Sequence, residues 1–409
     1  MYYNELKGGI DMLLSYTAKN FGSFKDKFEF SMKPGRVIDR FEDNVIDIDG
    51  VRKVSKVAVI VGENAGGKTS FMKSLHFFQY FIGQDGMGAS LKELCYDYNN
   101  DIPQSFEIVA LVDRYIYTYS MEIDKLSIVE EKLSVRGLNQ RKSSNKVVYK
   151  LSRIEIDDDE RIISEKYELN ETYIDDDIVK LINKTGLNSG ILLNTLNKFK
   201  VKIVQPFADW INNKLVIKLP SDHSLNVYKR IQKSEKDLEI LDTKEFLDIF
   251  SIIDSSIVGI SIDEKEPFSD SYIIRKKGDG RQFRIKLKND SSGVNDFFAW
   301  SVELWKVVYE NATLFADELD KVLNSILASR VLNYIKATEH QVHFFFSTHK
   351  VLHINTIDFM KEQIYFVNKD RNTLESKLYP LSSFKEYRYE KSKVYELYLK
   401  GLLGGVPNE

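Results

Sequence analysis

A glycine-rich stretch at residues 62–69 (GENAGGKT) contains the first residues of this sequence that could do chemistry. It matches the pattern G-x-x-x-x-G-K-[ST] at every position. Glycines let the backbone curl so that successive N–H groups point inward, and such a row of donors binds phosphate oxygens. The lysine of this pattern reaches the β- and γ-phosphates, and the hydroxyl after it is a ligand for Mg²⁺. The sequence therefore predicts a site for a nucleoside triphosphate, with ATP and Mg²⁺ as the ligands. The predicted nucleotide-binding residues are Gly62, Asn64, Ala65, Gly66, Gly67, Lys68, Thr69 and Ser70.

Two carboxylates at the end of an apolar run supply a second part of such a site. Residues 312–316 (ATLFA) have the character of a buried strand, and Asp317 and Glu318 follow them directly. We expect Asp317 to hold the metal together with Thr69, and Glu318 to polarise the attacking water as a general base. The alternative is a strand that ends in surface acids.

A second apolar run repeats this arrangement. Residues 342–346 (VHFFF) read as another buried strand, and His349 follows two polar residues after it. Ligands in open parallel sheets lie at the carboxyl ends of the strands, so His349 is expected to contact the γ-phosphate and sense its presence. A lone histidine is more often structural, but the position after a buried strand downstream of Asp317 favours function. The predicted catalytic residues are Lys68, Glu318 and His349.

A Ser-x-Gly turn precedes a helix that we predict at residues 294–309. The N-terminus of a helix attracts anions, so Ser291, Ser292 and Gly293 form a second turn suited to phosphate. A plain helix cap explains the same residues equally well.

The segments around these motifs predict an α/β fold. Residues 54–61 (VSKVAVIV) are a continuous apolar run, typical of a strand buried on both faces. Apolar residues then recur at helical spacing over residues 69–82, which gives the strand, loop and helix that the glycine pattern requires. Residues 105–123 alternate like the two strands of a hairpin.

Changes in pattern along the chain suggest three parts. We expect an N-terminal ATPase lobe with the glycine-rich loop at residues 1–151 and an inserted, mostly helical subdomain at 152–255. A C-terminal lobe at 256–409 then carries the Ser-x-Gly turn, the Asp-Glu strand and His349. Acidic runs at 157–160 and 175–177 are interpreted as solvated faces.

Composition narrows the setting. Of 409 residues, 43 % are hydrophobic and 29 % charged, which is ordinary for a soluble globular protein, and the net charge of -3 requires any nucleic-acid contact to use a local patch. The single cysteine, Cys95, fits a reducing cytoplasm, and no signal peptide or membrane span is evident. One hypothesis on the first residues is that Met12 is the natural start, because Lys7, Gly8 and Gly9 are what a ribosome-binding sequence would encode if translated.

The order of the motifs resembles an ABC-type ATPase head of the SMC-like class. In that family the nucleotide lies between two heads, of which one supplies the phosphate loop and the other the signature turn. The resemblance implies that Ser291, Ser292 and Gly293 act in trans and that Asp320 is the D-loop aspartate. It also implies a P-loop ABC-type head with a mixed sheet, an antiparallel β-lobe and an inserted helical subdomain. ATP-bound heads would then form a homodimer or a higher homo-oligomer.

Three segments resemble a narrower group, the RloA/AbiL-like ATPases of bacterial abortive infection and the ATPase subunit of PARIS-type phage defence. They are residues 13–24 (LLSYTAKNFGSF), 362–367 (EQIYFV) and 398–407 (YLKGLLGGVP). This resemblance implies an ATP-hydrolysing switch that holds or releases an effector and answers to a phage trigger protein. No cluster typical of a toprim or His-rich nuclease follows His349, so the effector is expected to be a separate protein, by resemblance a nuclease.

The sequence departs from the family pattern in places. Asp290 and Val294 stand where transporters have Leu and Gln, which puts transporter-like contacts of the turn in doubt. Lys350 follows the histidine where this family often has Asn. Gln104 is a weak candidate for the Q-loop glutamine, and Asn20 lies where such heads approach the nucleotide.

Two other functions compete with the switch. One is a DNA-repair head resembling RecF, in which a basic hairpin meets DNA phosphates, although a solvated hairpin face explains the same charges. The other is a scaffold that binds ATP without turnover, against which the predicted base Glu318 argues. The residues of the basic hairpin are Arg275, Lys276, Lys277, Arg281, Arg284, Lys286 and Lys288.

Overall fold

The structure is a computed structural model of the chain. It describes residues 11–36, 38–84, 94–97, 102–124, 128–156, 162–187, 190–219, 229, 231–337, 341–350, 358–385 and 394–404. Residues 1–10 of the suggested leader, the acidic run at 157–160 and the end of the C-terminal matching segment lie outside these described residues.

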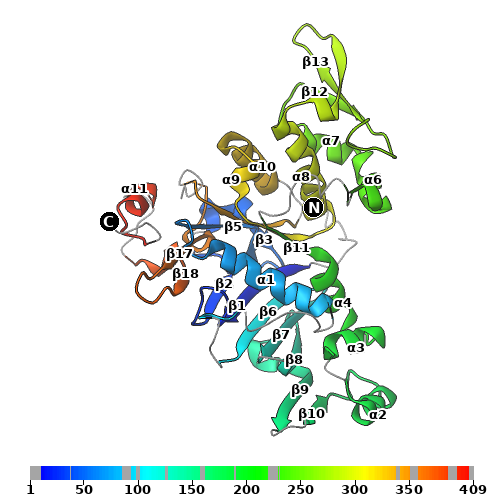
Figure 1. Cartoon of the computed structure of the whole chain (residues 1–409), viewed down its shortest axis with the longest axis vertical. Coiled ribbons are helices and arrows are strands. Elements are labelled where there is room, and N and C mark those ends of the chain that lie inside the picture. Colours follow the sequence, from blue (N-terminus) through cyan, green and yellow to red (C-terminus); the bar gives the residue numbers. More distant parts are fainter. Residues whose placement is uncertain are drawn as a thin grey trace.

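A six-stranded sheet runs through the centre of the molecule (Figure 1). Its strand order is β11-β15-β16-β5-β17-β18; the first five strands are parallel, and β18 is antiparallel to β17. Every side chain of β5, β15 and β16 is buried, as expected for strands covered on both faces. The predicted α/β fold with a mixed sheet is therefore confirmed. The strands are β5 (Val57–Gly62), β11 (Leu215–Lys218), β15 (Thr313–Ala316), β16 (His343–Thr348), β17 (Ile364–Lys369) and β18 (Ser376–Pro380).

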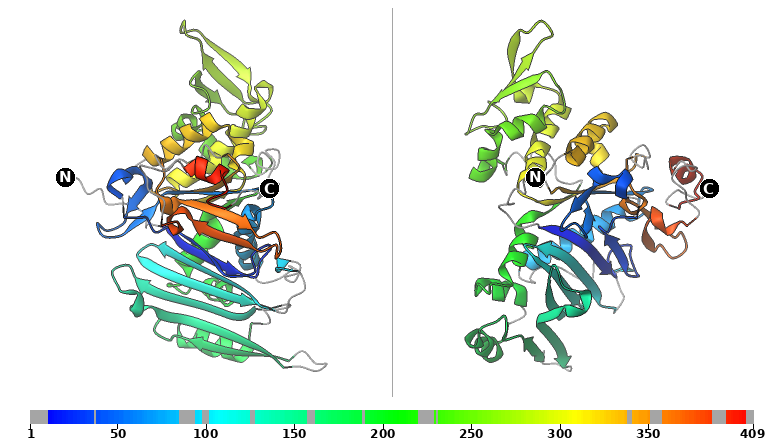
Figure 2. Two further views of the ribbon diagram at one scale, coloured as in Figure 1. Left: turned by 90° about the vertical axis from the view of Figure 1, so that its left-hand side faces the viewer. Right: turned by 180° about the vertical axis from the view of Figure 1, so that it is seen from behind.

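A seven-stranded antiparallel sheet forms the lower part of the molecule in Figure 2. Its order is β10-β9-β8-β7-β6-β1-β2, and buried and partly exposed residues alternate along β6 and β7. This is the antiparallel β-lobe expected from the sequence, and its hairpin over residues 105–123 is confirmed. The strands are β1 (Met12–Lys19), β2 (Phe28–Ser31), β6 (Gln104–Val112), β7 (Tyr115–Ile123), β8 (Ile128–Gly137), β9 (Lys146–Ile156) and β10 (Ile162–Leu169).

Helix α1 (Lys68–Gly83) lies between the two sheets and joins them through aromatic contacts. The ring of Phe71 lies 5.2 Å from that of Phe30 on β2 and 6.2 Å from that of Phe315 on β15. Further along the helix, Phe78 stacks on Phe106 of β6 at 5.4 Å. Because large aromatic rings are buried on both sides of α1, the start of this helix is fixed relative to both sheets.

Helices cover the other face of the central sheet, and a small three-stranded sheet projects beyond them (Figures 1 and 2). No helix in the described part of the chain is long and apolar enough to cross a membrane. The elements of this side are α6 (Glu235–Leu241), α7 (Lys244–Phe250), β12 (Ile257–Ser261), β13 (Tyr272–Lys276), β14 (Gln282–Lys286), α8 (Ser292–Tyr309), α9 (Leu319–Val322) and α10 (Ser325–Ala337). Apart from short 3-10 helices, the remaining elements of the described residues are β3 (Val45–Asp47), β4 (Lys53–Ser55), α2 (Asp176–Thr185), α3 (Leu192–Lys198), α4 (Gln205–Asp209), the π-helical turn η5 (Trp210–Lys214) and α11 (Val394–Leu399).

The apolar run at residues 54–61 is not one strand, which corrects the sequence prediction. The chain leaves β4, which pairs with β3, and enters β5 of the central sheet at Lys56. The N–H of Lys56 donates to the carbonyl of Asn44 at 2.8 Å, and its Nζ donates to the carbonyl of Lys336 at 3.1 Å. The side chain of this lysine therefore marks a change of sheet inside an otherwise apolar stretch.

The range 152–255, expected to be mostly helical, also holds strands. Strand β9 continues to Ile156, and β10 pairs along it in the antiparallel sheet. Strand β11 leaves the helical stretch and joins β15 in the central sheet. Because β11 has only four residues and follows directly after η5, its apolar side chains continue the helical spacing before them. The division of the chain into three domains stays a prediction.

Candidate functional site

The glycine-rich loop (residues 62–70, here the nucleotide loop) connects β5 to α1, and two of its glycines are required by close approach. A Cβ on Gly62 would lie 2.4 Å from the carbonyl oxygen of Val367 on the neighbouring strand. Gly67 has a φ of +121°, and a Cβ there would lie 2.6 Å from Oγ of Ser376. Asn64 and Ala65, at the crest between them, are exposed. The loop is therefore packed from below and open to solvent at its crest.

The start of α1 has the features of an anion site. Its N-cap is Gly67, and no side chain caps the N–H groups of the first turn. These N–H groups have no partner within the helix and carry the positive end of its dipole. Thr69 and Ser70, both partly exposed, lie in this turn. The arrangement fits a bound phosphate.

Lys68 is buried and folded back onto the loop that it follows. Its Nζ donates to the carbonyls of Gly62 at 2.8 Å and Glu63 at 2.9 Å, and lies 3.2 Å from Nδ1 of His349. These contacts use all three N–H bonds of the ammonium group. Burial lowers the pKa of Lys68 to about 8, although the nearby carboxylates of Asp317 and Glu318 act in the opposite direction.

Asp317 follows β15 and is buried beside the end of β16. Its Oδ1 accepts a close hydrogen bond from the hydroxyl of Ser347, while Oδ2 is buried with no hydrogen-bond partner among the described residues. Burial raises the pKa of Asp317, and the hydroxyls of Ser347 and Thr69 partly offset this effect. The unpartnered Oδ2 of Asp317 and the hydroxyl of Thr69 suit Mg²⁺. Proteins bind this ion through one or two carboxylates together with the phosphates of the substrate. The described residues hold no cluster of three or more His, Cys, Asp or Glu side chains that would bind a metal alone.

Glu318 has a left-handed backbone, with φ 52° and ψ 51°. A residue with a Cβ adopts this conformation at a cost of about 1–2 kcal/mol, and here the N–H of Glu318 donates to Oγ of Ser347 at 2.8 Å. The carboxylate lies between the ammonium of Lys321, its ion-pair partner, and the ring of His349. Burial acts to raise the pKa of Glu318, but contacts with Lys321 and His349 bring it below its ordinary value.

His349 connects the lysine to the base. Its Nε2 lies 3.3 Å from Oε1 of Glu318, and its backbone N–H donates to Oδ1 of Asp320 at 3.2 Å. Because the ammonium of Lys68 can only donate, Nδ1 of His349 accepts, and Nε2–H donates to Glu318. Lys68, His349, Glu318 and Lys321 thus form one chain of contacts across the carboxyl ends of β5, β15 and β16.

A protein-family model matches residues 57–355, which include both the nucleotide loop and His349. Its description is "AAA domain, putative AbiEii toxin, Type IV TA system". The chain belongs to this AAA domain family. No curated protein matches the sequence.

Three SMC heads are among the solved structures similar to this AAA domain. The SMC head bound to the C-winged helix domain of ScpA is 14 % identical over 90 % of this chain and 97 % of its own, with a TM-score of 0.43. The SMC head domain from Thermotoga maritima is 15 % identical over 90 % and 98 %, with a TM-score of 0.42. The Smc head with an extended coiled coil, bound to the C-terminal domain of ScpA and derived from Pyrococcus furiosus, is 14 % identical over 90 % and 96 %, with a TM-score of 0.39.

Some of the predicted site residues of the AAA domain lie elsewhere. Ser291, Ser292 and Gly293 (the signature turn) are exposed at the start of α8, and no hydrogen bond or ion pair joins them to the nucleotide loop within the described ranges. Asp320, by contrast, is bonded to His349 of the same chain.

Asn20 and Gln104 make hydrogen bonds with the backbone of the same chain, and their expected contacts with the nucleotide stay a prediction. The side chain of Asn20 donates to the carbonyl of Ile102 at 2.6 Å and accepts from the N–H of Tyr96 at 3.2 Å. Nε2 of Gln104 donates to the carbonyl of Asn20 at 2.9 Å. Both side chains are buried, with 1 % exposure each.

Two serines of the site were missed by the sequence analysis. Ser347 bonds both to Asp317 and to the N–H of Glu318, and its position next to the end of a buried strand was a usable signal. The Ser376 hydroxyl donates to the carbonyl of Gly66 at 2.7 Å and lies 2.7 Å from the hydroxyl of Ser23. No local pattern identifies Ser376, because its partners come from two distant parts of the chain.

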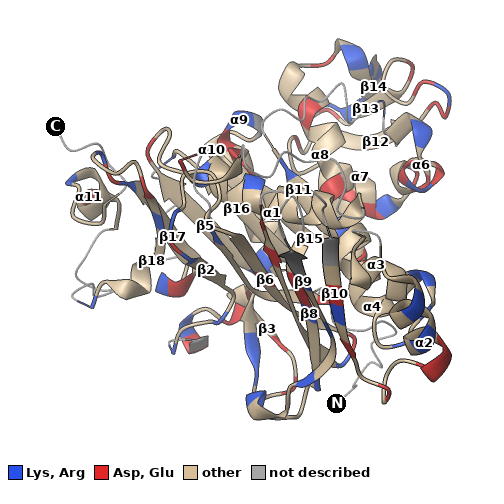
Figure 3. Cartoon of the chain, turned by 60° about the horizontal axis from the view of Figure 1, so that its bottom comes forward, with Lys and Arg blue, Asp and Glu red and all other residues tan. Residues whose placement is uncertain are grey.

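The basic hairpin is partly neutralised by acidic residues, and Figure 3 shows both signs of charge on β13 and β14. Arg281 pairs with Asp279 at 2.6 Å and Lys286 pairs with Asp270 at 2.9 Å. Arg275 is turned toward Asp290. Three of the seven basic side chains therefore meet carboxylates of the same chain, which weakens the field available to DNA phosphates.

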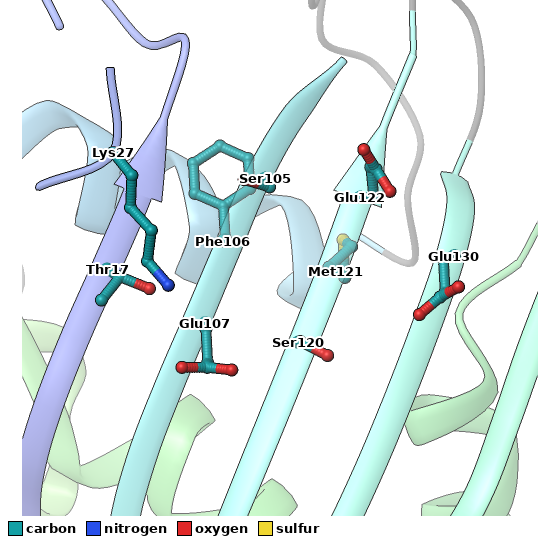
Figure 4. A pocket seen from close by; sticks show the side chains of 9 residues that line it. All are labelled: Thr17, Lys27, Ser105, Phe106, Glu107, Ser120, Met121, Glu122 and Glu130. Carbon is teal, nitrogen blue, oxygen red and sulfur yellow. The ribbon is translucent and has the colours of Figure 1, made fainter. Parts of the chain in front are cut away.

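A shallow depression of about 180 Å³ on the outer face of the antiparallel sheet is unsuited to a nucleotide (Figure 4). Carboxylates from three neighbouring strands lie in it, and they would repel phosphates. Its lining residues are Thr17, Lys27, Ser105, Phe106, Glu107, Ser120, Met121, Glu122 and Glu130.

Proposed function

We propose that this AAA domain is the ATP-hydrolysing switch subunit of a bacterial anti-phage defence system. Its heads pair around ATP, and hydrolysis separates them, so that a separate effector, a nuclease, is held or released. The observation that carries the ATPase activity is the contact between Lys68, His349 and Glu318 beside the buried Asp317. These side chains meet where the carboxyl ends of parallel strands adjoin a phosphate-binding helix start.

In this proposal the nucleotide loop and α1 bind the phosphates, and Lys68 exchanges its two loop carbonyls and His349 for phosphate oxygens. Asp317 and Thr69 would hold Mg²⁺, and a bound ion would neutralise developing charge on the phosphates. Glu318 orients the attacking water and accepts its proton as the water oxygen bonds to the γ-phosphorus. The bond from the γ-phosphorus to the bridging oxygen breaks at the same time, and ADP leaves with the electron pair of that bond. His349, released from Lys68, turns its Nε2–H from Glu318 to the γ-phosphate.

Pairing of heads is supported by a glycine that the single chain does not need. Apart from its chain neighbours and the backbone of its own helix, no atom of the described residues lies within 4 Å of a Cβ built on Gly293, and its φ is not in the left-handed region. At a position whose backbone suits alanine, glycine lowers stability because it leaves the unfolded chain more conformational freedom. A close approach by a second chain carrying ATP would require this glycine, in agreement with a signature turn that acts in trans.

The first prediction tests this pairing. Gly293→Ala should leave ATP affinity unchanged and raise the free energy of unfolding by about 0.4–1 kcal/mol, because alanine reduces the conformational freedom of the unfolded chain. ATP turnover and ATP-dependent pairing, measured by steady-state kinetics and light scattering, should be lost. Gly278→Ala is the matched control, because Gly278 also faces open space, in the turn between β13 and β14. Equal turnover in the two variants would contradict a signature turn acting in trans.

The defence role rests on the resemblance of residues 13–24 and 362–367, and the family description names a toxin of a type IV TA system. We predict that the native protein, isolated from its host, carries a nuclease with it. Cultures with the intact pair should outlast a phage challenge that lyses cultures carrying Lys68→Met. A host protein that purifies without an effector, and leaves phage plating unchanged, would contradict the defence role while leaving the ATPase activity intact.

A further inference from the structure

One arginine outside the nucleotide site is tied to the signature turn. Arg275 lies on β13, the middle strand of the small projecting sheet, and its side chain is only 13 % exposed. Its Nη2 and Nε donate to Oδ2 of Asp290 at 2.7 and 3.2 Å. Its Nη1 donates to Oγ of Ser256 at 2.8 Å and makes a close ion pair with Asp254. All three nitrogens of the guanidinium are therefore used.

Asp290 connects Arg275 to the signature turn. Its other carboxylate oxygen, Oδ1, accepts from the N–H of Ser291 at 2.8 Å, and its backbone N–H donates to the carbonyl of Leu287 at 3.0 Å. One carboxylate thus receives Arg275 on one side and the first residue of the signature turn on the other. Charge-assisted and paired donors fix geometry more strictly than single neutral hydrogen bonds do.

Neither neighbouring element depends on this bridge for its formation. Helix α8 has its own cap, in which the hydroxyl of Ser291 accepts from the N–H of Val294, and Phe298 packs on Phe246 and Phe250. Strand β13 is paired on both edges. What Arg275 adds is the orientation of the turn relative to the projecting sheet. This also gives a physical reason for Asp290 at a position where transporters have Leu.

We infer that Arg275 is a positioning residue for the signature turn, which it holds through Asp290 in the orientation that a second head requires. The inference rests on the proposed pairing of heads around ATP. Because the nucleotide loop lies elsewhere in the chain, a head without Arg275 should still bind ATP. It should no longer pair with a second head, and ATP hydrolysis should be lost with the pairing.

The experiment compares Arg275→Met with Lys286→Met, which breaks the Lys286–Asp270 pair in the same sheet without touching the turn. Arg275→Met should keep its ATP affinity, lose ATP-dependent pairing and lower turnover by on the order of 10²-fold, as expected for misplaced groups. Asp290→Ala should do the same, and the double variant should be no worse than either single one, because both residues act through one contact. Arg275→Lys, with one ammonium for two carboxylates, should be intermediate.

Two results would overturn the inference. One is an Arg275→Met protein that pairs and turns over ATP like Lys286→Met. The other is an Arg275→Met protein whose ATP affinity and thermal unfolding midpoint fall together with its turnover, which would show that Arg275 has a general structural role. If Arg275→Met does not fold, Asp290→Ala and Arg275→Lys decide between the same outcomes. An unsubstituted protein that neither pairs nor hydrolyses ATP would refute the proposed function itself. ATP-dependent pairing by both the unsubstituted protein and Arg275→Met would refute only the role of Arg275.

Discussion

Glu318→Gln should bind ATP, form paired heads and fail to release them. The substitution keeps the size of the side chain and an oxygen that can accept from Nε2–H of His349, but it removes the carboxylate that takes the proton of the attacking water. Loss of a general base lowers rates by roughly 10²–10⁴-fold. Phosphate release under saturating ATP measures turnover, and size-exclusion chromatography with light scattering measures pairing.

The control for this substitution is Glu310→Gln, which removes a carboxylate paired with Lys236 at the end of α8. It should hydrolyse ATP at the ordinary rate. Unchanged turnover in Glu318→Gln would show that another group is the base and would remove the main argument against an ATP-binding scaffold. A variant that neither pairs nor binds ATP would indicate that the carboxylate of Glu318 is needed for the local fold, through its contacts with Lys321 and His349.

The parts of the site that could be predicted are those where a short stretch of sequence fixes both the chemistry and the local element. The nucleotide loop is one, because glycines, lysine and threonine stand at fixed offsets between a strand and a helix. Asp317 and His349 are others, because each follows an apolar run, and parallel strands bring such ends to one edge of a sheet. The order of the strands, in which β16 lies between β5 and β15, then sets their contacts.

The parts that could not be predicted depend on partners far away in the chain. Ser376 supports the nucleotide loop together with Ser23, from the opposite end of the sequence. Asn20 is expected near the nucleotide from the family resemblance alone, and no local pattern predicts the bonds of its side chain to Ile102 and Tyr96. Strand β11 belongs to the central sheet only because its edge meets β15, a contact that no local pattern records. In each case the tertiary partner decides, and a single sequence does not identify it.

Lys68→Met should greatly weaken ATP binding without unfolding the protein. Methionine keeps most of the buried apolar stem but loses the ammonium that phosphates would attract away from Gly62, Glu63 and His349. Two hydrogen bonds to charged groups, at about 1.5–3 kcal/mol each, correspond to a loss of roughly 10²–10⁴-fold in affinity. Titration calorimetry with ATP checks the expected loss, and Lys73→Met, an exposed lysine on the same helix, should bind as the unsubstituted protein does.

The pH dependence of this binding separates a charge effect from a packing effect. Burial lowers the pKa of Lys68 in the free chain to about 8, whereas bound phosphates would favour the charged form and raise that pKa. ATP binding above about pH 8 must therefore take up a proton, so affinity should fall by up to about tenfold per pH unit there and stay level below it. The Lys73→Met protein should show the same fall, and the weak residual binding of Lys68→Met should show none. A level profile in the unsubstituted protein would mean that Lys68 does not meet the phosphates, and the nucleotide loop would then lose its central contact.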